Sequence, residues 1–324
     1  MKRFVFLIAN FVMLILFASC SAYGFFWGQF GDEDVDDRSP SLIDFGTLDL
    51  STQNQQVSSI YTFLVFTDSH FGSEKEQFNE DFFLAWFESL YKNYSAGDSK
   101  KIAKLPRFAI NLGDTADGGK EEQFIEYLRF EAKLKAVANK YLYGEASSEL
   151  SQTFRVYSVL GNHDLYHNGA KYFENLIYPH TSSYFFRIDA DSKDSALGFS
   201  YYFLDTANGT AGTKQLKDLK KKLEVDPRPK IVLTHYPIYA GGTDMFMIIQ
   251  NTLERNTILT YFAKNNVKQV YEGHAHSDYG FDFGKFREDV VGSLRFSGRA
   301  ERQCALVTVN EQTQQVFTEI VKFN

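Results

Sequence analysis

Short apolar runs alternate with longer helix-like stretches from Ile60 onward, and this alternation restricts the fold more than any other feature of the sequence. The runs are apolar nearly throughout, which is typical of strands buried on both faces. Buried strands that alternate with helices predict parallel βαβ units in a mixed α/β fold. The predicted strands are 60–67, 108–112, 156–160, 231–234 and 267–271, and the predicted helices are 78–94, 120–138, 214–223 and 252–264.

Two regions depart from the alternation. Residues 184–204 hold two aromatic, strand-like runs on either side of a polar turn, which predicts a β-hairpin. Residues 281–322 also contain successive strand-like runs. We therefore expect antiparallel strands to complete one or two sheets around the parallel ones.

Side chains that can bind metal follow each of the five predicted strands directly. The carboxyl ends of strands border the binding crevice of an open α/β sheet, so five loops are expected to meet at one edge. Each cluster alone is weak evidence, but five of the seven histidines fall in these loops. The clusters are Asp68-Ser69-His70, Gly113-Asp114, Gly161-Asn162-His163-Asp164, His235 and Gly273-His274-Ala275-His276.

In this order the five clusters resemble the motifs of the calcineurin-like metallophosphoesterase family, over about residues 60–276. The resemblance implies the four-layer fold of metallo-dependent phosphatases, a sandwich of two mixed β-sheets flanked by helices, with a two-metal centre at the sheet edge. The implied ligands are Asp68, His70 and His276 for one metal, Asn162, His235 and His274 for the other, and Asp114 as the bridge between them.

This set of ligands also indicates which metals to expect. Histidine, carboxylate and amide ligands suit divalent Mn, Fe or Zn, and the absence of thiolates argues against a closed structural zinc site. Two such cations can clamp a phosphate oxygen and activate water for attack at phosphorus.

His163 has a different implied role. In the family pattern it faces the phosphate and protonates the departing oxygen, and Asp164 is expected to orient its ring and keep it protonated. The alternative is that His163 only caps its loop. Asp117 is expected to support its loop or a ligand rather than to bind metal.

The first 19 residues predict a signal peptide. Lys2 and Arg3 precede an apolar stretch, 4–17, which is shorter than the roughly 20 residues that span a membrane. Cys20 follows Ala18-Ser19 and resembles the cysteine of a bacterial lipobox, which predicts an exported protein attached to the cell-envelope membrane through lipidated Cys20. The alternative is cleavage near Ala22, which gives a soluble secreted or periplasmic protein.

The remaining chain divides into a tether and a domain. Residues 20–59 are polar, contain the acidic run 32–37 and lack periodicity, so a tether is expected there, followed by a phosphoesterase domain over 60–324. If Cys20 carries lipid, Cys304 has no disulfide partner. It lies in a strand-like run, where a buried and inert thiol is expected.

The charge of the chain narrows the choice of substrate. The net charge is −7, and loss of Lys2 and Arg3 with the signal peptide makes it −9, which disfavours nucleic acid as a partner and a nuclease activity. The leading prediction is hydrolysis of a small phosphomonoester or nucleotide. The alternatives are a phosphodiesterase acting on cyclic nucleotides or glycerophosphodiesters, and a catalytically silent binding module at the cell surface.

Overall fold

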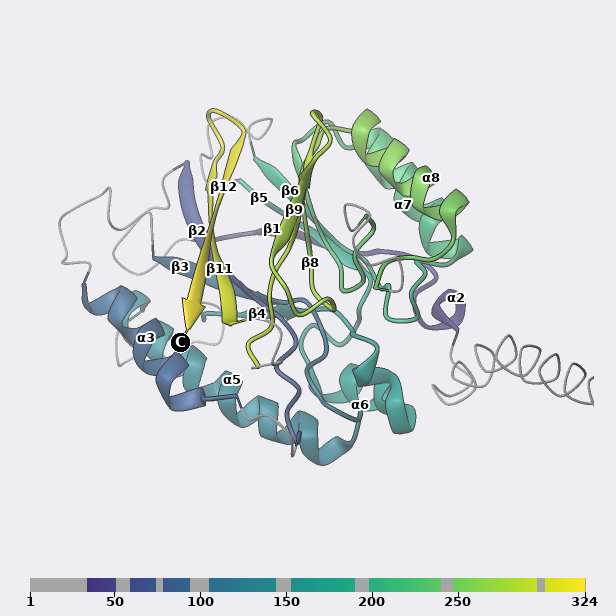
Figure 1. Ribbon diagram of the computed structural model, residues 1–324. Coiled ribbons are helices and arrows are strands. Elements are labelled where there is room, and N and C mark those ends of the chain that lie inside the picture. The colour runs from purple at the N-terminus through teal and green to yellow at the C-terminus, as the bar shows by residue number, and fades with distance from the viewer. Residues whose placement is uncertain are drawn as a thin grey trace, which may run out of the picture.

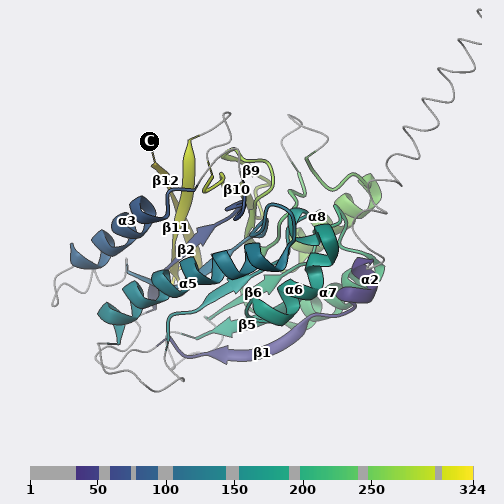
Figure 2. The same ribbon diagram turned by 90° about the horizontal axis from the view of Figure 1, so that it is seen from below.

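The computed structural model describes residues 34–50, 59–73, 78–93, 105–143, 153–189, 198–239, 247–295 and 301–323. In this part of the chain two β-sheets lie between two layers of helices (Figures 1 and 2). The predicted signal peptide and Cys20 lie outside the described residues. No helix within them combines the length and the apolar character needed to cross a membrane.

The larger sheet has seven strands and mixed directions. The hairpin predicted over 184–204 forms β5 and β6, and β7 and β8 continue the sheet in parallel. The strands in spatial order are β1 (Ile43–Leu48), β5 (Tyr184–Ile188), β6 (Phe199–Phe203), β7 (Lys230–Leu233), β8 (Val267–Glu272), β10 (Arg287–Val290) and β9 (Tyr279–Asp282).

The smaller sheet has five strands. Its parallel part consists of β2, β3 and β4, and the two C-terminal strands pair antiparallel beside β2. The spatial order is β12 (Gln315–Phe323), β11 (Arg302–Asn310), β2 (Ile60–Phe66), β3 (Pro106–Asn111) and β4 (Val156–Ser158).

Helices cover the outer face of each sheet (Figure 1). One group packs on the five-stranded sheet: α3 (Glu80–Lys92), α5 (Glu121–Leu142) and α6 (Gly169–Leu176). The other packs on the seven-stranded sheet: α7 (Thr213–Val225) and α8 (Thr252–Lys264). The described residues also contain two short helices, α2 (Val35–Arg38) and the 3-10 helix η1 (His163–Asn168).

The period of two along each strand explains the layers. On β2, Phe63 and Val65 enter the core between the sheets, whereas Leu64 and Phe66 pack under α3 and α5. All four side chains are fully buried, and each such burial contributes about 1.5–3 kcal/mol. Strands apolar on both faces are therefore stable only between two covered surfaces, as the sequence predicts.

The predicted fold class is confirmed, and the predicted strands and helices correspond closely to the observed ones. The C-terminal strands are β9 to β12. Cys304 on β11 is a free and fully buried cysteine, as expected.

The prediction of a tether is wrong for its described part, residues 34–50. β1 pairs in parallel with β5 at the edge of the seven-stranded sheet. Before it, Arg38 forms a buried ion pair with Asp205, Nε to Oδ2 at 2.7 Å. A short polar segment that is held by edge pairing and a few side-chain contacts needs no apolar face, so its sequence shows no periodicity. For this reason β1 could not be predicted from composition.

Candidate metal centre

The loops that carry the predicted ligands meet where the two sheets end together. Three follow β2, β3 and β4 of the smaller sheet, and two follow β7 and β8 of the larger one. Backbone hydrogen bonds join them: Asp68 N donates to Gly113 O and His70 N to Asp114 O, both at 3.0 Å. On the other sheet, Gly273 N donates to His235 O at 3.0 Å. The predicted meeting of five loops at one edge is present in the structure.

The backbone at this edge is conformationally unusual. Asp68, His70, Asp114, His274 and His276 have φ values of +53°, +44°, +50°, +65° and +51°. Non-glycine residues rarely adopt this left-handed conformation, and such residues cluster at functional sites because their surroundings must hold them there. The fold therefore stabilises these five residues in conformations that ordinary loops avoid.

A glycine permits two of the loops to approach closely. A Cβ atom on Gly161 would lie 2.1 Å from Asp114 N, well inside contact distance. The same approach allows His163 N to donate to Asp114 Oδ1 at 2.8 Å. A side chain at position 161 would push the loop after β4 away from Asp114.

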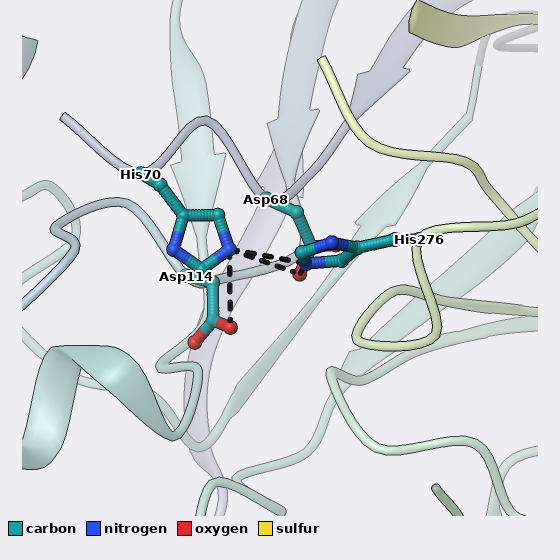
Figure 3. Close-up of side chains that lie close together, drawn as sticks. All are labelled: Asp68, His70, Asp114 and His276. Atoms are coloured by element: carbon teal, nitrogen blue, oxygen red, sulfur yellow. Dashed lines mark hydrogen bonds and ion pairs between the residues drawn. The ribbon is translucent and has the colours of Figure 1, made fainter. Parts of the chain in front are cut away.

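The first group of ligand atoms comprises Asp68, His70, Asp114 and His276 (Figure 3). His70 Nε2 lies 3.1 Å from His276 Nε2 and 3.6 Å from Asp114 Oδ2. His276 Nε2 is 3.1 Å from Asp68 Oδ1. Figure 3 shows these side chains turned toward one another from the loops after β2, β3 and β8.

The second group shares Asp114 with the first and adds His235 and His274. His235 Nε2 lies 3.4 Å from Asp114 Oδ1 and 3.1 Å from Asn162 Oδ1. The His235 and His274 rings are 5.1 Å apart between centroids. All seven predicted ligands thus fall into two adjoining groups, with Asp114 common to both.

One carboxylate oxygen in these groups lacks the hydrogen-bond donor that burial normally requires. Asp68 Oδ1 is buried and has no hydrogen-bond donor among the described residues, although His276 Nε2 lies nearby. His235 Nδ1 can donate to Leu112 O at 2.8 Å, which directs the Nε2 lone pair at Asn162 and Asp114. Buried acceptors that converge in this way are costly unless a cation lies between them.

The pKa shifts agree with a site that requires positive charge. Burial lowers the pKa of His235, but the charge of Asp114 outweighs it and raises the value to about 9. Burial raises the pKa of Asp68, but His276 outweighs it and lowers the value to about 2. Burial and His235 lower the pKa of His274 to about 3, which keeps its lone pair available. The carboxylate, imidazole and amide donors therefore fit divalent metal ions.

His163 lies beside the first group, with its ring centroid 4.6 Å from that of His70. Its Nδ1 is 2.7 Å from Asp117 O, so a proton on Nδ1 is held by the backbone and Nε2 is left for other contacts.

The prediction that Asp164 orients His163 is wrong. The Asp164 carboxylate accepts backbone hydrogen bonds from Ala116 N at 2.8 Å and Gly161 N at 2.9 Å. His163 and Asp164 are adjacent at the start of η1, and their side chains have different partners. Burial raises the pKa of Asp164 to about 7. Asp164 therefore stabilises the loops after β3 and β4.

The family model described as "Calcineurin-like phosphoesterase" matches residues 61–278, more than half of the chain. The chain belongs to the calcineurin-like phosphoesterase family. The matched range contains every predicted ligand of this phosphoesterase.

A curated relative from Fibrobacter succinogenes, named "Probable cyclic nucleotide phosphodiesterase", is 30% identical over 123 residues, which is 37% of this chain. The match spans 45% of that relative, so this chain is similar to less than half of its length.

The comparison with solved structures includes the two matches below, and the first of them resembles the phosphoesterase in fold. A dimetal phosphatase from Danio rerio has a TM-score of 0.54 at 12% identity, with 83% of this chain and 100% of that chain covered. GAP50 of Plasmodium, described as the anchor in the inner membrane complex, has a TM-score of 0.49 at 17% identity, with 82% and 89% covered.

The sequence does not predict the contacts of two residues beside the phosphoesterase site, Thr67 and Arg295. Thr67 Oγ1 and His274 N both donate to Asp68 Oδ2, at 2.7 and 3.0 Å. Asp117 was expected to support a ligand, and its carboxylate lies 3.2 Å from His70 Nδ1. Arg295 donates to that carboxylate at 3.0 Å. It lies outside all five clusters, so no local pattern identifies it.

Proposed function

We propose that this phosphoesterase hydrolyses small phosphate esters at a centre of two divalent metal ions. Asp68, His70 and His276 would hold one ion, and Asn162, His235 and His274 the other. Asp114 would bind both.

The observation that carries this proposal is the convergence of buried acceptor atoms in two groups that share Asp114. A single ion could compensate only one group, because the other would keep its lone pairs unpaired. Two ions with a common carboxylate would satisfy both, and Asp114 directs one oxygen toward each group: Oδ2 toward His70 and Oδ1 toward His235.

Two bound ions would supply Lewis acidity and an activated water for attack at phosphorus. The chain itself would supply a proton to the leaving oxygen, through Nε2 of His163. The Asp117 carbonyl would hold the His163 ring by Nδ1, and Asp114 fixes the His163 backbone through the hydrogen bond from His163 N. A general acid positioned in this way accelerates a reaction by about 10²–10⁴-fold.

A second candidate is hydrolysis of cyclic nucleotides, which are phosphodiesters. The similarity to the Fibrobacter succinogenes relative favours it, although that match spans only part of each protein. Small phosphomonoesters and nucleotides remain the first candidate, as the sequence predicts, and the net charge of −7 disfavours nucleic acid as a substrate of either activity.

The test compares p-nitrophenyl phosphate, bis-p-nitrophenyl phosphate and cyclic AMP as substrates of the protein supplied with Mn, Fe, Zn or Co. We expect turnover of at least one ester, near-complete loss in Asp114→Asn, and loss in His163→Ala that is larger for poor leaving groups. His180→Ala is the matched control, because His180 is exposed and its side chain contacts Glu174 O and the Tyr178 ring, neither of which belongs to a proposed ligand. Absence of turnover with all four metals would refute the enzymatic function.

We also propose that Cys20 attaches the protein to the membrane. Cys20 lies outside the described residues, and support comes from the sequence alone. The wild-type protein is expected to partition into the detergent phase of a Triton X-114 extract and the Cys20→Ala variant into the aqueous phase. Retention of Cys20→Ala in the detergent phase would exclude this anchor.

A further inference from the structure

Asp117 contacts two histidines of the proposed centre with different parts of the residue. Its Oδ1 lies 3.2 Å from Nδ1 of His70, a proposed ligand. Its backbone oxygen lies 2.7 Å from Nδ1 of His163, the proposed proton donor. One residue therefore contacts both rings.

The backbone holds Asp117 in this position. Asp117 N donates to Phe71 O at 3.0 Å, and Phe71 N donates to Thr115 O at 2.8 Å. Phe71 and Ala116 form a parallel β-bridge. The loop after β3 thus runs alongside the loop after β2, and this pairing brings the Asp117 carboxylate against the His70 ring.

Arg295 approaches the same carboxylate from a third segment. Its Nη1 donates to Asp117 Oδ1 at 3.0 Å, and its side chain is 13% exposed. The segment that carries Arg295 is fixed to the first ligand loop, since Leu294 N donates to Thr67 O at 3.0 Å and Ser293 Oγ to Asp68 O at 2.8 Å. Arg295 N in turn donates to Ser293 Oγ at 3.0 Å.

We propose that Arg295 and Asp117 are positioning residues of the metal centre: Arg295 holds the Asp117 carboxylate against His70 Nδ1, so that His70 presents Nε2 to the metal. The inference rests on the proposed function, since it assigns these residues to the same site. Neither residue touches the substrate in this proposal.

The chemistry follows from the two contacts of Asp117 Oδ1. A carboxylate on Nδ1 of a metal-binding histidine fixes the proton there, orients the ring and makes the other nitrogen a stronger ligand. The guanidinium of Arg295 is always charged and planar, so it keeps the carboxylate ionised and limits its rotation. Loss of such an outer partner typically weakens metal affinity by about 10–100-fold.

The experiment titrates the metal-free full chain with Mn²⁺ alone by calorimetry, so that the readout does not depend on activity. We expect Asp117→Asn to weaken Mn²⁺ binding by about 10–100-fold and Arg295→Gln by about tenfold. If Arg295 acts through Asp117, the double variant should bind no more weakly than Asp117→Asn alone. Arg295→Lys, which keeps the charge and loses the planar fork, should fall between wild type and Arg295→Gln.

Arg228→Gln is the matched control. Arg228 is similarly buried, with a side chain 14% exposed, and pairs with Asp189 at 3.2 Å, but it contacts no proposed ligand among the described residues. Its Mn²⁺ affinity should equal that of wild type. Because His163 contacts the backbone oxygen of Asp117, Asp117→Asn should leave the ratio of rates for good and poor leaving groups unchanged.

Three results would overturn the proposal. The first is Arg295→Gln with wild-type Mn²⁺ affinity and a raised KM, which would mean that Arg295 binds substrate. The second is an additive loss in the double variant, and the third is wild-type affinity in Asp117→Asn. If circular dichroism shows that Arg295→Gln does not fold, the Mn²⁺ affinities of Arg295→Lys and Asp117→Asn test the proposal instead. A wild type that binds Mn²⁺ and hydrolyses no ester refutes the proposed function, while the affinities still test this inference.

Discussion

Two buried carboxylate clusters in this protein are neutralised differently. At Asp205, Arg38 supplies hydrogen bonds to both carboxylate oxygens, and Ser39 Oγ and Ala207 N donate to them as well. At Asp68 and Asp114, histidine nitrogens and an amide oxygen surround the carboxylates, and Asp68 Oδ1 has no donor among the described residues. Both clusters are buried, but an arginine, which is always charged, neutralises the Asp205 cluster, whereas positive charge beside Asp114 depends on protonation of His235.

The difference separates a structural polar cluster from a functional one. A buried carboxylate that is paired with arginine has its charge neutralised within the chain. The pair also joins two segments, here the segment before β1 and the loop after β6. A buried cluster of acceptor atoms that lacks such a partner needs a bound cation to compensate it. Substitutions in the first should therefore change stability, and substitutions in the second should change metal binding and catalysis.

The largest expected effect is on the Asp205 cluster. Arg38→Ala would leave Asp205 charged and uncompensated inside the protein, which costs about 3–5 kcal/mol of unfolding free energy. Chemical denaturation measures this, and Mn²⁺ affinity should not change once folding is accounted for. Lys214→Ala is the control, because its pair with Asp37 is largely exposed and should contribute at most about 1 kcal/mol. A loss below about 1 kcal/mol for Arg38→Ala would mean that Arg38 does not provide the main compensation for the charge of Asp205.

The second prediction tests the cluster at Asp68 and Asp114. Asp114→Asn removes one charge from the carboxylate common to both groups and should lower kcat/KM by at least about 10²–10³-fold, the usual cost of one preorganised electrostatic group. Steady-state kinetics at saturating Mn²⁺ measure it. The variant should also lose most of the rise in melting temperature that Mn²⁺ gives to the wild type. Activity within tenfold of wild type would exclude Asp114 as the shared ligand.

The sequence predicted well which side chains lie close together, because each follows a strand directly. Short apolar runs locate the strands, and parallel strands bring their carboxyl ends to one edge, so residues from Asp68 to His276 could be grouped without coordinates. The partners of those ligands were harder to predict. Arg295 and Asp117 are 178 positions apart in the sequence, and hydrophobic periodicity gives no information about such a contact.

Two errors have the same origin. Asp164 was assigned to its neighbour His163, but adjacent side chains on a tight turn point to different partners, and Asp164 binds backbone amides of two loops. The segment around β1 was assigned to a tether because it is polar, and its pairing with β5 depends on residues far along the chain. Local sequence patterns predict the helices, the strands and the loops that carry the proposed ligands, whereas contacts between distant segments can be identified only from the structure.

Metal removal gives the third prediction. Stripping the wild type with a chelator should lower its stability, because the acceptors at Asp68 and Asp114 lose their compensating charge. At a free Mn²⁺ concentration 100 times Kd, the metal should add about 2.7 kcal/mol to the unfolding free energy. Melting temperatures with Mn²⁺ and with excess chelator measure it, and Arg38→Ala should show the same increment as wild type. Equal stability with and without metal would contradict a cluster that needs a bound cation.

A third buried cluster extends the comparison, because here a proton is the expected compensation. Glu272 on β8 and Glu288 on β10 accept backbone hydrogen bonds from Ile238 N at 2.9 Å and Tyr239 N at 2.6 Å. Their second oxygens, Oε2 in each, are buried without a donor among the described residues. Burial raises the pKa of both carboxyls, to about 7 for Glu288. A proton shared between the two side chains would satisfy both Oε2 atoms.

The smallest predicted effect follows from the pKa of Glu288. A carboxyl with a folded pKa of about 7 and an ordinary value of 4.5 contributes stability that is complete below about pH 4.5 and is lost as the pH rises through 7. The loss is about 1.4 kcal/mol per pH unit inside that window. Glu288→Gln keeps an oxygen for Tyr239 N and offers an amide to Glu272, so its unfolding free energy should vary less between pH 5 and 7. Denaturation at several pH values measures the slope, and Glu224→Gln, on the exposed face of α7, is the control. An unchanged slope in Glu288→Gln would mean that this pair is compensated by something other than a shared proton.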